Sequence, residues 1–277
     1  MNVLTLQSGV ALGHVGNAGA VLALARLGLE AWRIDTVRFS NPPAHGSHTG
    51  RPAAADEIAE MVAGLAEVGA LARCDAVLSG YVGTPEVASE IGRTVDTVRA
   101  ANPSAIYVCD PAIGNDGGLF VATEAARRVA SELLPRADIV TPNAFELGFL
   151  VDEAVASVEG AVAACRELRR RGPGVVVATS VQGAAPGELA TLGVDGEGTW
   201  VVTTPRLQGP MHGAGDLFAA LFLGHTLLRR DLAAALSAAV SSAFAVCRAT
   251  GGAPDLALIA AQDELAAPSQ VFAAERL

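Results

Sequence analysis

The chain has 277 residues, of which 51% are hydrophobic and 17% are charged, and its formal net charge is −10. This composition excludes a disordered or fibrous protein, and the acidic balance argues against a surface for nucleic acid or for an anionic membrane. A chain of this length buries roughly 75% of the surface that its unfolded form exposes, so it folds without disulfides or a structural metal. We expect one domain over residues 1–277 that binds small molecules.

The basic residues narrow the chemistry, because all nineteen are Arg and the chain contains no Lys. A Walker A loop requires a Lys against the nucleotide phosphates, and a Schiff-base enzyme requires an amine nucleophile, so both are excluded. The N-terminus lacks the basic segment of a signal peptide, and we therefore expect a cytoplasmic protein. The cysteines show no metal-ligand spacing, which predicts isolated buried thiols at Cys74, Cys109, Cys165 and Cys247.

Short apolar runs alternate with longer stretches of helical periodicity along most of the chain. The runs predict strands over residues 2–6, 31–37, 76–78, 105–109, 139–140 and 174–178. The periodic stretches predict helices over residues 18–27, 53–71, 85–101, 123–134 and 158–171. This alternation is typical of an α/β fold with a largely parallel sheet that helices cover on both faces.

Residues 191–202 break the alternation, because two short apolar segments flank an Asp-Gly-Glu-Gly turn. They predict an antiparallel hairpin at an edge of the sheet. Two helices follow, over residues 216–229 and 232–249. The second helix is rich in Ala but includes Arg248 and several Ser, which indicates a packed helix rather than a membrane span. Ligands of such folds bind beyond the carboxyl ends of the strands, so the residues after each strand are candidates for function.

The strongest local signal is the turn Gly213-Ala214-Gly215-Asp216, which opens an apolar helix. The first turn of a helix leaves backbone N–H groups free at the positive end of the helix dipole, and such a turn binds anions. Asp216 would direct a carboxylate at the same space. An ordinary tight turn with Asp216 as a helix cap explains this stretch about equally well.

Polar residues also follow two of the predicted strands. Asp110 ends the strand over residues 105–109, and Asn143 and Glu146 begin the helix after residues 139–140. Asn followed three residues later by Glu is a capping box, which is a purely structural alternative. Because both strand ends face the same crevice of a parallel sheet, these oxygen ligands together suit Mg²⁺.

The N-terminal strand leads into a Gly-rich loop that only weakly resembles a dinucleotide-binding fingerprint. Ser8 lies near the end of that strand and is a candidate for hydrogen bonding to a polar ligand. His14 is more simply explained as a helix-start or packing residue than as a catalytic one.

Six segments carry a more specific signal when they are taken together. They are Gln7-Ser8 with Gly13-His14-x-Gly16-Asn17, Thr36-Val37-x-Phe39-Ser40-Asn41, Cys74 to Tyr81, Cys109-Asp110-Pro111, Thr141-Pro142-Asn143-x2-Glu146, and Gly213-Ala214-Gly215-Asp216. This ordered set resembles pyridoxal kinases, within the ribokinase-like superfamily, over nearly the whole chain. The first three segments narrow the resemblance to the pyridoxal branch.

The resemblance implies a ribokinase-like three-layer α/β/α fold with a largely parallel central sheet and an antiparallel edge hairpin. It implies ATP-dependent phosphorylation of the 5′-hydroxymethyl group of pyridoxal, with Mg²⁺ as cofactor and a homodimer as assembly. Asp216 matches the general base, and the amides of Gly213, Ala214 and Gly215 match an anion hole for the transferred phosphoryl group.

The resemblance also assigns binding residues. Those matching the pyridoxal site are Ser8, Asn41, Pro43, Ala44, Tyr81 and Asp216. Those matching the ATP site are Asp110, Thr141, Asn143, Glu146, Thr179, Ser180, Thr204, Pro205, Arg206 and Leu207. Asp110 and Glu146 match the metal-binding positions.

Two departures bear on the substrate. Pyridoxal kinases commonly continue Ser-Asn with His-Thr, whereas this chain has Pro42-Pro43-Ala44-His45, and some bacterial members have a Lys where Thr179 stands. Pro offers neither a hydroxyl nor an N–H, and losing such a hydrogen bond costs about 1–3 kcal/mol, roughly 5- to 150-fold in binding.

Three functions stay open: a pyridoxal kinase, a kinase of another hydroxymethyl heterocycle such as hydroxymethylpyrimidine or of a sugar, and a non-catalytic vitamer-binding protein. The sequence of residues 39–51 fits a mobile flap and an ordinary surface loop equally well.

Overall fold

The computed structural model describes residues 1–277 and contains twelve strands and eight helices. The strands are β1 (Asn2–Val10), β2 (Glu30–Phe39), β3 (Gly50–Pro52), β4 (Ala76–Ser79), β5 (Ile106–Cys109), β6 (Gly114–Asn115), β7 (Gly118–Leu119), β8 (Ile139–Val140), β9 (Val175–Gln182), β10 (Glu188–Val194), β11 (Thr199–Pro205) and β12 (Glu275–Arg276). The helices are α1 (Asn17–Arg26), α2 (Ala55–Glu67), α3 (Pro85–Ala101), α4 (Thr123–Arg128), α5 (Ala144–Val151), α6 (Val158–Arg169), α7 (Ala214–Arg229) and α8 (Leu232–Thr250).

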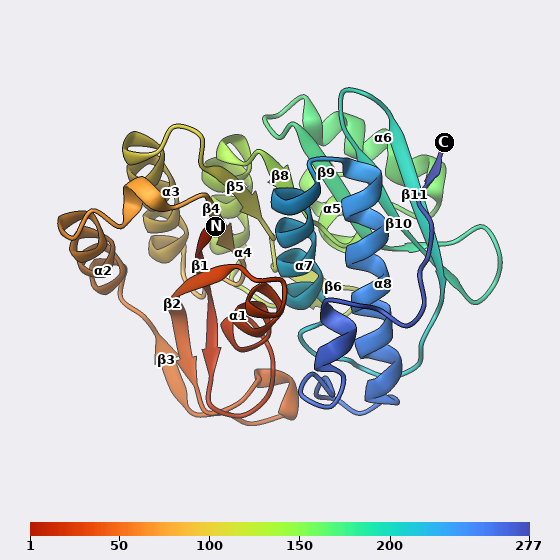
Figure 1. Cartoon of the computed structure of the whole chain (residues 1–277), viewed down its shortest axis with the longest axis horizontal. Coiled ribbons are helices and arrows are strands. Elements are labelled where there is room, and N and C mark those ends of the chain that lie inside the picture. Colours follow the sequence, from red (N-terminus) through yellow and green to blue (C-terminus); the bar gives the residue numbers. More distant parts are fainter.

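Ten of the strands form one central sheet in the order β12-β11-β10-β9-β8-β5-β4-β1-β2-β3 (Figure 1). The six strands from β9 to β2 in that order run parallel, and antiparallel strands continue the sheet at both ends. The carboxyl ends of the parallel strands therefore meet at one edge of the sheet. The short hairpin β6-β7 forms separately, directly after β5.

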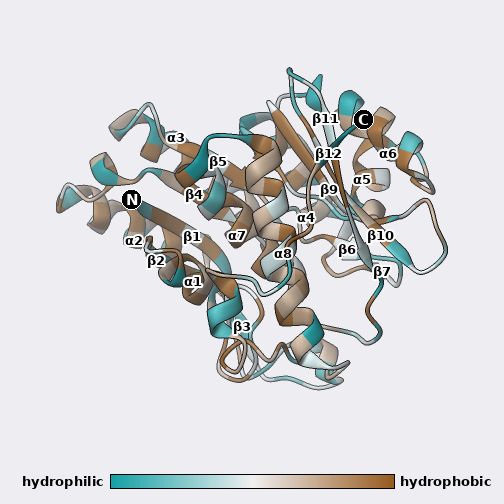
Figure 2. Ribbon diagram, turned by 45° about the vertical axis from the view of Figure 1, so that its right-hand side comes forward, coloured by the Kyte–Doolittle hydropathy of each residue, from teal (hydrophilic) through white to brown (hydrophobic).

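Helices cover both faces of this sheet and bury two apolar clusters. Helices α2 to α6 pack on one face around a core of 41 buried residues, and α1, α7 and α8 pack on the other around 27. Figure 2 shows that the strands between these layers are largely hydrophobic. Strands covered on both sides are apolar throughout rather than alternating, which is why the sequence marks them as short continuous runs. The α/β/α class expected from the sequence is confirmed.

Several element boundaries differ from the predictions. β1 continues to Val10, so Ser8 lies within the strand rather than after it. The helix predicted over residues 53–71 ends at Glu67, shortly before Gly69, whose φ of 69° is incompatible with a helix. The helix predicted over 123–134 is α-helical only to Arg128 and then widens into one π-helical stretch before Pro135.

The predicted antiparallel hairpin β10-β11 is present at one end of the sheet, where the two-residue strand β12 pairs with Trp200 and Val201 of β11 from outside. Strand β12 was not predicted, because residues 275–276 form too short a strand to leave an apolar pattern in the sequence. Cys74, Cys109 and Cys165 are buried free thiols as expected, whereas Cys247 is partly exposed. Helix α8 alone is long and apolar enough to cross a membrane, and half of its length is buried against the protein.

A buried hydrogen bond between neighbouring strands provides a stability test of this core. The hydroxyls of Ser79 in β4 and Tyr107 in β5 lie 2.7 Å apart, and both side chains are fully buried. Tyr107→Phe leaves the Ser79 hydroxyl without this partner, so we expect a loss of about 1–3 kcal/mol in the free energy of unfolding, measured by urea denaturation. The double variant Ser79→Ala/Tyr107→Phe removes both polar groups and should recover part of that loss; equal stability of Tyr107→Phe and the native chain would contradict the expectation.

Candidate active site

Two neighbouring cavities lie at the carboxyl ends of the parallel strands. We call them the larger cavity, of about 480 Å³, and the smaller cavity, of about 410 Å³. The residues common to both walls are Asn115, Asn143, Thr179, Ser180, Pro210, Met211, Ala214 and Gly215. Because the two cavities share this wall, molecules bound in each would meet at the beginning of α7.

The beginning of α7 leaves several backbone donors free at the junction of the cavities. Gly213 caps the helix with a φ of 90°, and a Cβ there would lie 2.7 Å from the carbonyl oxygen of His14, so only glycine fits. The N–H groups of Gly213, Gly215 and Asp216 donate to no group in the protein, whereas Ala214 donates to the Met211 carbonyl at 3.2 Å. Of the three amides expected from the sequence, Ala214 is thus already paired, and Asp216 adds one that was not expected.

The carboxylate of Asp216 lines the larger cavity next to these donors. Its Oδ2 accepts a hydrogen bond of 2.8 Å from the Gly16 N–H, and its Oδ1 accepts none from the protein. Burial raises the pKa of Asp216 to about 6, and the Gly16 N–H offsets part of that rise by stabilising the charged form. The group therefore has one oxygen free to take a proton.

Two further carboxyl groups line the same cavity. Asp110 follows β5 and is buried; its Oδ1 accepts from the Thr141 hydroxyl at 3.1 Å, and its Oδ2 accepts no protein hydrogen bond. Burial and the charges of Glu146 and Asp216 raise the pKa of Asp110 well above its usual value. The sequence prediction that these acids face one crevice holds in the geometry.

Glu146 is held from several sides by backbone donors. Its Oε1 accepts from Ile113 at 2.8 Å and from Gly114 at 3.3 Å, and its Oε2 accepts from Asn143 at 3.0 Å. Asn143 caps α5 through its Oδ1, so the capping box expected as a structural alternative is formed. Burial nevertheless raises the pKa of Glu146 to about 7. Glu146 thus fulfils the structural role and lines the cavity at the same time.

These carboxyl groups fit a hard divalent cation. Asp110 has an oxygen without a protein donor, and no Lys or Arg lines the larger cavity to balance the acids. Mg²⁺ binds through one or two carboxylates and otherwise keeps water and phosphate ligands. Asp110 is the residue best placed to bind it directly, because both oxygens of Glu146 are already engaged by N–H groups.

The lining of the larger cavity also offers two free hydroxyl groups. Ser8 and Tyr81 both line it, and neither side chain makes a hydrogen bond within the protein. Pro42, Pro43 and Ala44 lie on the same wall and present no side-chain donor. Asn41 lines neither cavity; its amide donates to the Ser47 carbonyl at 2.7 Å and so closes the loop on itself. The His14 ring lies outside both linings as well.

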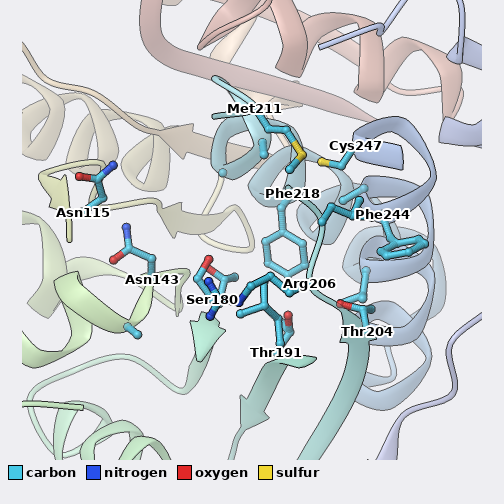
Figure 3. A pocket seen from close by; sticks show the side chains of 18 of the residues that line it. Asn115, Asn143, Ser180, Thr191, Thr204, Arg206, Met211, Phe218, Phe244 and Cys247 are labelled. Carbon is cyan, nitrogen blue, oxygen red and sulfur yellow. The ribbon is translucent and has the colours of Figure 1, made fainter. Parts of the chain in front are cut away.

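The smaller cavity brings together Thr204, Pro205, Arg206 and Leu207 with Thr179 and Ser180, all expected at a nucleotide site. Figure 3 shows Asn115 and Asn143 on one side of it, and on the other Phe218, Phe244 and the adjacent sulfur atoms of Met211 and Cys247. The contributions of Phe218 in α7 and of Phe244 and Cys247 in α8 were missed, because the spacing of these residues is that of core positions. Asn115, Phe120 and His212 at the larger cavity were missed as well, since they lie on loops or short hairpins without a motif.

The chain matches one family model and several known proteins over most or all of its length. The phosphomethylpyrimidine kinase family model matches residues 49–249. The chain is 44% identical to the pyridoxal kinase PdxY of Rubrobacter xylanophilus over all of this chain and 98% of that protein, and 42% identical to that of Deinococcus radiodurans over 100% and 96%. A structure of the Leishmania donovani pyridoxal kinase in complex with ADP and pyridoxamine superimposes with a TM-score of 0.93 at 28% identity, covering 100% of this chain and 99% of that one.

The fold and the site together define a kinase of small hydroxylated molecules. With these relatives over its full length, the chain belongs to the pyridoxal kinase family. It is therefore an enzyme, and the alternative of a non-catalytic binding protein is set aside.

The two glycines at the start of α7 give a matched test of the anion site. A Cβ at Gly215 meets no protein atom within 4 Å, so Gly215→Ala should fold normally while its methyl group occupies the shared wall of the cavities. We expect its affinity for ADP, measured by calorimetry, to fall by about tenfold or more, a typical cost of about 1.4 kcal/mol. Gly213→Ala should instead lower the melting temperature, because its Cβ meets the His14 carbonyl. Unchanged ADP affinity in Gly215→Ala would speak against an anion site here.

Proposed function

We propose that this chain transfers the γ-phosphoryl group of ATP to the 5′-hydroxymethyl group of pyridoxal. One observation carries this proposal: Asp216, a carboxylate with a free oxygen, lines the larger cavity beside unpaired N–H groups, next to Gly215 on the wall that the two cavities share. Pyridoxal would occupy the larger cavity and ATP the smaller one. The choice of these two ligands is supported by the pyridoxal kinase relatives and by the similar structures in complex with ADP and pyridoxamine or pyridoxine.

The reaction assigns a distinct task to each part of the wall. Asp216 Oδ1 accepts the proton of the alcohol while the alcohol oxygen attacks the γ-phosphorus, and the bond from that phosphorus to the bridging oxygen breaks to release ADP. The free N–H groups of Gly213, Gly215 and Asp216 stabilise the charge on the transferred phosphoryl group. Ser8 and Tyr81 would bind polar substituents of the pyridine ring.

We assign the remaining predicted residues to nucleotide and metal. Thr141, Asn143, Thr179 and Ser180 would contact the phosphates, and residues 204–207 the nucleoside. Mg²⁺, bound by Asp110 with Glu146 beside it, would neutralise the phosphates. The homodimer and the cytoplasmic location implied by the family belong to this proposal. Asn41 would act indirectly, by shaping the loop that carries Pro42 to Ala44.

A second substrate, hydroxymethylpyrimidine, is favoured by two observations. The matching family model is described as phosphomethylpyrimidine kinase, and the Pro42-Pro43 wall lacks the donor that pyridoxal kinases commonly present. We expect pyridoxal to give the highest kcat/KM in an ADP-release assay across pyridoxal, pyridoxine, pyridoxamine and hydroxymethylpyrimidine. A higher kcat/KM for the pyrimidine would reverse the assignment, and product identification by mass spectrometry excludes plain ATP hydrolysis.

The role of Asp216 is tested by Asp216→Asn, which keeps the size of the side chain but removes the base. We expect kcat to fall by about 10²- to 10⁴-fold, with affinity for ADP within roughly threefold of the native enzyme. Asp152→Asn, at the exposed end of α5, serves as a surface control and should retain full activity. Full activity of Asp216→Asn would exclude Asp216 as the base.

A further inference from the structure

We propose that Asn17 and Asp35 are positioning residues for the base, because together they fix the Gly16 N–H that holds the Asp216 carboxylate. The proposal rests on the assignment of Asp216 as base given above. Neither Asn17 nor Asp35 lines either cavity, so both would act through Gly16 and not on the substrate.

Asn17 ties the start of α1 to the sheet. It is the first residue of that helix and is fully buried. Its Nδ2 lies 2.7 Å from Asp35 Oδ1, 3.0 Å from the Ile34 carbonyl and 3.3 Å from the Gln7 carbonyl. An amide nitrogen has only two hydrogens, so the two shorter contacts are the main ones, and both go to β2. The side chain thereby fixes the residue that follows Gly16.

The Asp35 carboxylate is itself held in place by contacts with its neighbours. Its carboxylate packs directly over Gly9, where a Cβ would lie 2.5 Å from it. The Arg33 guanidinium is 3.7 Å away and largely exposed, so it provides only a weak ion pair. The bond from Asn17 is the one hydrogen bond that the Asp35 carboxylate accepts. Because its acceptor is a charged carboxylate, this hydrogen bond is stronger than one to a neutral oxygen.

Gly16 has little freedom between these anchors. Its φ is 56°, and a Cβ would lie 2.2 Å from Ser8 Oγ and 2.3 Å from the Ser8 carbonyl oxygen. The Gly16 backbone therefore packs directly against Ser8, which lines the larger cavity. Its N–H donates to Asp216 Oδ2, two hundred residues along the chain. Holding Oδ2 in this way turns Oδ1 toward the cavity. A shift of the Gly16 peptide would therefore move the Asp216 carboxylate relative to the residues of the larger cavity that would hold the substrate.

The pair Asp35→Ala and Asp35→Asn tests this arrangement. Both variants lose the charge and the contact with Arg33, but only Asp35→Asn keeps an oxygen that can accept from Asn17. We expect kcat to fall by about 10- to 100-fold in Asp35→Ala, as for a small displacement of a catalytic group, and by less than about threefold in Asp35→Asn. KM for ATP and the affinity for ADP should stay within about twofold in both.

The pH profile distinguishes positioning from a general loss of stability. The titratable groups that line the larger cavity are Tyr81, Asp110, Glu146, His212 and Asp216. Losing the Gly16 donor disfavours the charged form of Asp216, so the acid limb of the kcat profile should move to higher pH in Asp35→Ala and stay in place in Asp35→Asn. Asn17→Asp, which replaces the donor by an acceptor, should behave as Asp35→Ala does, with circular dichroism melts showing which variants are folded.

Native enzyme and Asp216→Asn are measured in the same series. If the native enzyme forms no pyridoxal 5′-phosphate, the proposed function fails, and if Asp216→Asn stays active, the assignment of the base fails. If both of those hold but folded Asp35→Ala and Asp35→Asn have the same kcat and the same acid limb, the positioning role is overturned.

Discussion

Three carboxyl groups share one cavity whose lining contains no Lys or Arg to balance them, His212 being the one basic side chain there. Asp110, Glu146 and Asp216 come from three separate elements, and burial raises the pKa of each. Nucleotide phosphates would add more negative charge at the same place. Helix dipoles and free N–H groups contribute only partial charges. In the proposed reaction, much of the compensating charge would come from cations that enter with the nucleotide, together with Arg206 at the smaller cavity.

The sheet topology brings these groups together without any of them being neighbours in sequence. Parallel strands deliver Asp110 and Asn143 to one edge, and the chain returns after the antiparallel hairpin to place α7 across the same edge. Beside the larger cavity, the loop that carries Pro42 to Ala44 is closed by its own hydrogen bonds. One side-chain hydrogen bond leaves it, from His45 to Asp255 at 3.0 Å, and the His45 ring also lies 6.2 Å from the His212 ring. The wall of the larger cavity is therefore anchored to the segment that follows α8.

Much of the fold and of the site could be predicted from sequence because its signals are local. Continuous apolar runs marked the parallel strands, and Gly213 to Asp216 marked the turn at which α7 begins. What the sequence could not provide depends on contacts between distant segments. The Gly16 N–H has no side chain to identify it as a donor, and its bond to Asp216 exists only once α1 and α7 pack together. Likewise, Phe244 and Cys247 have the spacing of core residues, and only the cavity shows otherwise.

The C-terminal strand has a consequence for how the molecule behaves in a crowded solution. Residues 275–276 pair with Trp200 and Val201, and Leu277 donates to the Thr199 carbonyl, so the last residues of the chain occupy the rim of β11. Without this cover, β11 would present a row of open peptide groups on which a second molecule could add its own strand. Residues 275–277 thus protect the part of β11 from Thr199 to Val201 against pairing with a strand of a second molecule.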